Sequence, residues 1–149
     1  MKSLRNLKRL SAYLEHFKVD GLECGWICAT GEKDATSKLD KLSGAQVLIA
    51  RPEIRQNAVD SDGRDEYIDS AVFVLGRDLG LGKTDEKENA QYSVLLNIAE
   101  VVLDRIREDI DSEGCPPLAG FVLTDVQVVP EALIFGGWCG WSIDLSFRI

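Results

Sequence analysis

The sequence contains few of the groups that enzymes and metalloproteins use. Its 149 residues include one histidine, His16, and no C-x-x-C pair among the four cysteines, Cys24, Cys28, Cys115 and Cys139. A structural zinc site would need all four thiolates to converge from unrelated spacings, so we interpret them as reduced, mostly buried thiols. Nucleophilic catalysis would have to use His16, which lies beside an apolar helical stripe and is more typical of a helix-surface or packing residue. We therefore expect no catalytic residues, no cofactor and no metal.

Long apolar segments and basic clusters are also scarce. No run of about 18 apolar residues is present, and the amino terminus has no signal-peptide core, so we expect a cytoplasmic protein without membrane contact. A formal charge of −8, from 17 basic and 25 acidic residues, disfavours nucleic acid as a partner. We interpret the one basic cluster as a solvated face of the first helix: it consists of Lys2, Arg5, Lys8 and Arg9.

The composition is that of one globular domain over residues 1–149. Hydrophobic residues make up 45% and charged residues 28%, which is enough apolar material for one core. The clearest pattern is the strict alternation of the last nine residues, which is typical of a half-buried strand. Its apolar members are Trp141, Ile143, Leu145, Phe147 and Ile149. A strand-like run at 121–129 and a Gly-rich turn at 136–140 precede it, so we predict a closing antiparallel hairpin.

The amino-terminal part begins with a predicted helix that Ser3 can cap and Gly21 ends. Its apolar stripe has spacings of three and four and consists of Leu4, Leu7, Leu10, Leu14 and Phe17. A short strand follows at about 22–29. The next segment, Gly31–Ser43, is rich in Lys, Asp, Thr and Ser, and we predict a mobile loop there.

Two further strands are predicted at 45–50 and 68–75. The stretch between them is too short and too polar for a crossover helix, which argues against a parallel pair. We therefore predict a long antiparallel hairpin with a wide, acidic tip.

The longest helix is predicted to open with a capping box formed by Asp85 and Glu88, and to end before Gly114 and two prolines. Its expected core stripe is Val94, Leu95, Ile98, Val101, Val102, Ile106 and Ile110. The predicted order is helix, three strands, helix and two strands. That order indicates an α+β fold, with an antiparallel or mixed sheet of about four to five strands and two main helices packed on one face.

Two loops resemble ligand-binding motifs without matching them. In the segment 76–84, a Walker loop would need a glycine at Arg77, and Gly76 lies one place too early, so we expect no nucleotide binding. The acidic segment that begins at Asp60 resembles a calcium loop. It lacks the fifth-position ligand, and Ala71 stands where the closing Glu would be, so we interpret it as a hairpin tip.

The three tryptophans, Trp26, Trp138 and Trp141, could form an aromatic binding surface. We favour core packing or a subunit contact for them, because Trp141 belongs to the inward-pointing set of the last strand. A possible interaction surface is nevertheless assigned to Trp26, Asp60, Asp62, Arg64 and Trp138.

The second helix and the final hairpin, which closes with Gly140-Trp141 and a short alternating strand, complete a pattern that is similar to a known family. The chain resembles the tail terminator and tail completion proteins of long-tailed bacteriophages and prophages: an amino-terminal helix, a long hairpin, a helix such as Asn89–Ile110 and a closing hairpin. The resemblance spans most of the chain, but the extended Gly31–Ser43 segment has no match in it.

The resemblance implies a non-enzymatic structural protein that forms a homo-oligomeric ring, commonly a hexamer, and joins the tail tube to the head. The implied partners are other copies of the chain and the tail-tube or head–tail connector proteins, in the bacterial cytoplasm or in the virion. Two other classes remain open: an enzyme or nucleotide-binding module centred on Gly76–Thr84, and a small ligand-binding or regulatory domain that uses the tryptophans.

Overall fold

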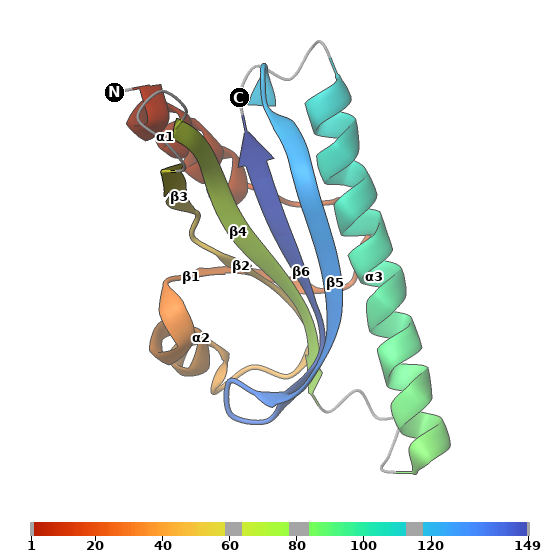
Figure 1. Cartoon of the computed structure of the whole chain (residues 1–149). Helices are drawn as coiled ribbons and strands as arrows, with labels where there is room; N and C mark the ends of the chain where they lie inside the picture. The colour runs from red at the N-terminus through yellow and green to blue at the C-terminus, as the bar shows by residue number, and fades with distance from the viewer. Residues whose placement is uncertain (1, 59–63, 78–83, 113–117, 149) are drawn as a thin grey trace.

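The computed structural model describes residues 2–58, 64–77, 84–112 and 118–148. Within these residues the chain forms three helices and six strands (Figure 1). In chain order they are α1 (Lys2–Glu15), β1 (Gly25–Ala29), α2 (Gly31–Leu39), β2 (Gly44–Ala50), β3 (Glu53–Ala58), β4 (Arg64–Arg77), α3 (Asp85–Asp111), β5 (Val122–Ile134) and β6 (Trp138–Arg148). The predicted α+β class is confirmed.

All six strands belong to one mixed sheet. Its order is β1-β2-β4-β6-β5, and β3 pairs with β4 outside this path. β1 and β2 are parallel, with Trp26 opposite Val47, and the other pairings are antiparallel. β6 lies between β4 and β5, so the predicted closing hairpin is confirmed. Its alternation is explained by burial, because Trp141, Ile143, Leu145 and Phe147 face the main core.

The helices divide between the two faces of the sheet. α1 and α3 pack on the first face, where the main core lies, and α2 packs on the second (Figure 1). The alternation of β2 separates the two cores: Val47 and Ile49 belong to the main core, whereas Leu48 belongs to the smaller one. The predicted arrangement of two main helices on one face therefore holds for α1 and α3.

α2 corrects the prediction of a mobile loop over Gly31–Ser43. It forms the crossover that joins the parallel strands β1 and β2. Ala35 and Leu39, one helical turn apart, are both buried in one cluster with Leu48. The sequence did not predict this helix, because the segment is mostly polar and only two of its side chains pack on the sheet. In such a helix most of the stability comes from tertiary packing.

The sheet has one strand more than predicted, and the additional strand is β3. β2 and β3 both pair with the same edge of β4, because β6 occupies the other edge. Arg51 and Pro52 separate the two strands, as expected for proline, which cannot donate a ladder hydrogen bond. The predicted antiparallel hairpin is therefore confirmed, with one arm split into two strands. Its tip at 59–63 lies outside the described residues.

Helix α1 buries a shorter stripe than predicted. Leu10 and Leu14 are buried and Leu7 is half-buried, but Leu4 is 55% exposed. Phe17 is buried as well, but it lies beyond the end of the helix at Glu15. The amino-terminal turn of α1 thus leaves a large apolar side chain in solvent.

Helix α3 also differs from its prediction at the cap and along the stripe. The cap is Thr84, one residue before the predicted Asp85, and its side chain accepts a hydrogen bond from the Lys87 backbone N–H. Val94 and Val101 are 47% and 39% exposed. The buried stripe is narrower than predicted and consists of Leu95, Ala99, Val102 and Ile106.

Candidate interaction surface

β5 is a long strand with one unpaired edge. It spans 13 residues, pairs with β6 on one side and has no strand on its other side in the described part of the chain. Unpaired N–H and C=O groups along such an edge can pair with a strand from another molecule. The pairing with β6 is irregular between Leu123 and Asp125 and between Glu131 and Ile134. The regular part of the edge is therefore the short segment 125–129, next to Pro130.

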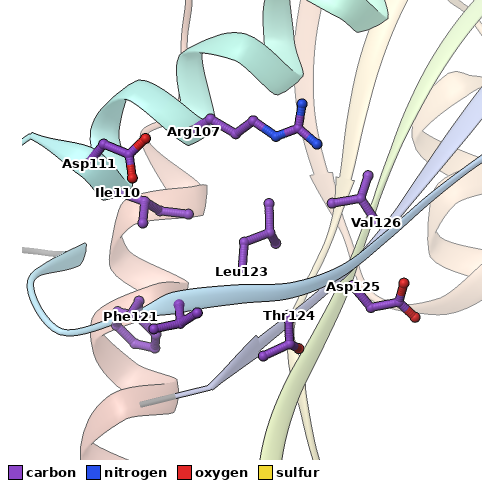
Figure 2. Close-up of a pocket in the computed structure, with 9 residues that line it drawn as sticks. Arg107, Ile110, Asp111, Phe121, Leu123, Thr124, Asp125 and Val126 are labelled. Atoms are coloured by element: carbon purple, nitrogen blue, oxygen red, sulfur yellow. The ribbon is translucent and has the colours of Figure 1, made fainter.

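A groove of about 650 Å³ lies between the carboxyl-terminal end of α3 and the beginning of β5. In Figure 2, Leu123 and Val126 point from β5 toward α3, whereas Asp125 points to the other side. Arg107 and Ile110 line the groove from the helix. An extended peptide could therefore pair with the edge through its backbone while alternate side chains enter the groove.

Exposed apolar side chains surround this edge. Val122 and Val128 of β5 are 56% and 41% exposed. Isolated exposed apolar residues are common on protein surfaces, but a group of them beside an unpaired strand is typical of an interaction site.

Near its amino-terminal end, α3 is hydrogen-bonded to β5 and β6. The Tyr92 hydroxyl donates a hydrogen bond to the Glu131 carbonyl at 2.7 Å, and Trp141 Nε1 donates to the Tyr92 carbonyl at 2.8 Å. Burial, together with the neighbouring Cys139, raises the pKa of Tyr92 to about 12, so its hydroxyl keeps its proton. The groove thus lies at the opposite end of α3 from these two hydrogen bonds.

On the second face of the sheet, beyond α2, charged side chains lie on neighbouring strands. Asp69 accepts hydrogen bonds from Arg55 and Ser146, both at 2.7 Å. Burial opposes ionisation of Asp69, but these two hydrogen bonds outweigh it and hold its pKa below the usual range. Asp144 behaves in the opposite way: burial raises the pKa of its carboxyl, and the negative charge of Glu131 raises it further.

The residues of the predicted interaction surface do not come together. Trp138 is fully buried, with the Arg77 guanidinium 4.7 Å from its ring centroid, so its assignment to a surface was wrong and core packing is correct. Trp26 is half-buried against Phe17 and lines a separate cavity that His16 also borders. Arg64 opens β4. The other two members, Asp60 and Asp62, lie outside the described residues.

Arg77 has a structural role that the sequence did not reveal. Its Nη2 donates hydrogen bonds to the carbonyls of Leu39, Asp40 and Leu42, at the carboxyl end of α2. This side chain therefore satisfies carbonyls that a helix end leaves unpaired. Of the segment compared with a Walker loop, residues 78–83 lie outside the described part.

The cysteines do not form a disulfide or a metal site within the described residues. Cys24, Cys28 and Cys139 are free and half-buried, and burial raises the pKa of the Cys24 and Cys28 thiols. Cys115 lies outside the described part. No group of three or more potential ligands gathers to hold a metal ion among the residues that the structure describes. No helix in these residues combines the length and apolar composition needed to cross a bilayer.

The free β5 edge, with its groove and exposed valines, was not among the sequence predictions. The only indication of it in the sequence was that apolar and polar residues alternate less regularly along β5 than along β6. Comparison with protein-family models and with curated proteins finds no match for this chain.

Proposed function

We propose that this protein is a structural component of a bacteriophage or prophage tail, of the terminator or completion type. It forms a homo-oligomeric ring that caps the tail tube and joins it to the head, first in the host cytoplasm and then in the virion. The element order supports this proposal, because α1, the hairpin of β2, β3 and β4, helix α3 and the closing hairpin follow one another as the resemblance implies.

The observation that carries the proposal is the free edge of β5 with its adjoining groove. β1 and β5 lie at opposite ends of the sheet, so a contact from the β5 edge to a different surface of the next molecule is heterologous. Heterologous contacts that close by rotation produce rings. The exposed Val122 and Val128 supply apolar surface for a neighbouring copy or for a tail-tube subunit.

A small ligand-binding or regulatory domain is the second candidate. One observation favours it: the groove of about 650 Å³ is within the range of roughly 300–1,000 Å³ that is typical of small-molecule sites. Its open position beside a free strand edge fits a peptide better than an enclosed ligand, so we rank this function second.

The test is binding to assembled tubes of the tail-tube protein encoded beside this gene. Co-sedimentation and electron microscopy should find the protein at tube ends. Val128→Lys places a charge on the β5 edge and should weaken tube binding at least tenfold, because strand pairing would bury an unpaired ammonium group. The matched control is Leu133→Lys, at a residue that is 78% exposed beyond the regular part of the edge, and it should bind as the parent does.

The proposal fails if the parent protein binds no tubes at any salt concentration and the neighbouring genes are unrelated to phage. Equal binding by the parent and Val128→Lys would preserve the tail role but remove β5 from the interface. Circular dichroism of each variant checks that the substitution has not unfolded the chain.

A further inference from the structure

Two adjoining cavities lie on the second face of the sheet, beside the amino-terminal end of α2. One has a volume of about 280 Å³ and the other about 440 Å³, and Gly31, Ala50 and Ala71 line both. Together they form a trough that is apolar at one end and charged at the other.

The smaller cavity is apolar. Small side chains form much of its wall, Phe73 and Phe135 close one side of it, and Glu32 stands at the helix end. Its volume of about 280 Å³ is below the range of roughly 300–1,000 Å³ that is usual for small-molecule pockets. A single aliphatic side chain with its neighbouring backbone therefore suits it better than a cofactor.

The larger cavity carries an excess of negative charge. Glu53, Asp69 and Asp144 line it together with one cation, Arg51. Arg51 is paired with Glu15 at 2.8 Å, and Asp69 is paired with Arg55. No salt bridge within the described residues neutralises Glu53 or Asp144. The charged end of the trough therefore suits a cationic group.

The chain itself has a surface of the complementary kind. Leu4 of α1 is 55% exposed, and Arg5 and Lys8 beside it are exposed as well. Residues four apart on a helix lie on the same side, so Leu4 and Lys8 are neighbours, with Arg5 next to them. The first turns of α1 thus present an aliphatic side chain beside two cations.

We propose that the amino-terminal turn of α1 from one copy docks in the trough of a second copy. Leu4 enters the apolar cavity, while Arg5 and Lys8 face Glu53 and Asp144 at its charged end. α1 packs on the first face of the sheet and the trough lies on the second, so a chain does not fill its own trough.

The contact joins two different surfaces, so each copy can bind one neighbour through its α1 and another through its trough. It is therefore heterologous, and it leads to a ring or a filament. The inference rests on charge and shape within this chain and does not depend on the tail function, although such a contact is the kind that the proposed ring requires.

The test is sedimentation velocity of the full chain over a range of concentrations and ionic strengths. The parent should associate, and the association should weaken as salt screens the ion pairs. Leu4→Ser, Arg5→Glu with Lys8→Glu, and Glu53→Lys with Asp144→Lys should each weaken association at least tenfold. Lys18→Glu with Lys41→Glu is the matched control, because it changes the net charge as the α1 pair does but at other exposed lysines.

The decisive variant combines all four charge reversals of the α1 pair and the trough pair. It keeps the parent's formal charge of −8 and should regain association, because both sides of the contact have changed sign. A parent that is monomeric at every concentration, or a fourfold variant that stays dissociated while folded, would overturn the proposal. Tube binding is measured separately through Val128→Lys, so failure of this contact and failure of the tail function are distinguishable.

Discussion

Tyr92 and Trp141 connect helix α3 to strand β6 through two independent contacts. Their rings meet edge to face, with centroids 5.9 Å apart and planes at 90°, and the indole N–H donates to the Tyr92 carbonyl at 2.8 Å. Edge-to-face geometry is the arrangement that the ring quadrupoles favour. The helix is therefore held at a defined position over the sheet, at the end opposite the groove.

Replacing Trp141 with Phe should test this connection. Phe retains an aromatic ring but has no N–H donor, so it leaves the Tyr92 carbonyl without this partner. We expect the free energy of unfolding to fall by about 1–2 kcal/mol, measured by urea denaturation. Leu133→Ala, at a side chain that is 78% exposed, should change stability by less than about 0.5 kcal/mol. A smaller effect for Trp141→Phe than for this control would contradict the assigned hydrogen bond.

The stripe of α3 can be tested at two adjacent residues. Leu95 is fully buried, so Leu95→Ala should cost about 2–5 kcal/mol of stability. Leu145→Ala in β6 should fall in the same range, whereas Ile98→Ala should cost less because Ile98 is only partly buried. Val94→Ala should stay within about 0.5 kcal/mol. Equal costs at Leu95 and Val94 would mean that α3 is rotated relative to the sheet.

Gly140 allows close contact between strands β6 and β4. A Cβ atom at this position would lie 2.0 Å from the Val74 carbonyl oxygen, which belongs to the backbone and cannot move aside. Gly140→Ala should therefore destabilise the protein by about 1–3 kcal/mol or more. Gly25→Ala is the comparison, because its Cβ would meet only the side chain of Gln46. Thermal unfolding should show the larger loss for Gly140→Ala, and the reverse order would refute the contact.

Asp69 and Asp144 should have opposite effects on stability as pH changes. The folded-state pKa of Asp69 lies below its ordinary value of 3.8, so its ionised form stabilises the fold above that pH and the contribution is lost as pH falls through the folded pKa. The folded-state pKa of Asp144 is raised, so ionisation costs stability above the folded pKa, and the cost disappears as pH falls toward 3.8.

Substitution of each residue by Asn should distinguish the effects of the two carboxylates on stability. At neutral pH, Asp69→Asn should lower the melting temperature and Asp144→Asn should raise it. Near pH 3 both differences from the parent should shrink. Melting curves from pH 3 to pH 8 measure this, and a stabilising Asp69→Asn at neutral pH would show that its two hydrogen bonds do not outweigh its burial.

The sequence alone determined the elements whose burial follows a local period. The alternation at 141–148 predicted β6 and its hairpin, and the apolar spacing around Leu95 predicted α3. Burial on one face of a strand or helix imposes a repeat that neighbouring residues carry by themselves. The α+β class followed from the order of these elements.

The tertiary structure decided what depends on distant partners. α2 is helical because Ala35 and Leu39 pack in one cluster with Leu48, and its own residues carry only a weak periodic signal. Trp138 is buried because that cluster and Arg77 surround it, although its Gly-rich surroundings in the sequence resemble an exposed turn. β5 has a free edge because it lies at one end of the sheet. No pattern within β5 itself specifies that it is an edge strand.

For the proposed contact, too, the sequence alone determines one side and only the tertiary structure determines the other. The sequence contains Leu4, Arg5 and Lys8 as neighbours, so the cationic surface on α1 can be identified from spacing. Its proposed counterpart combines residues from β1, α2, β2, β3, β4 and β6, which range along the chain from Ala29 to Ser146. Only the folded sheet brings Glu53 and Asp144 into one cavity, because contacts between strands depend on register and order, which local periodicity does not encode.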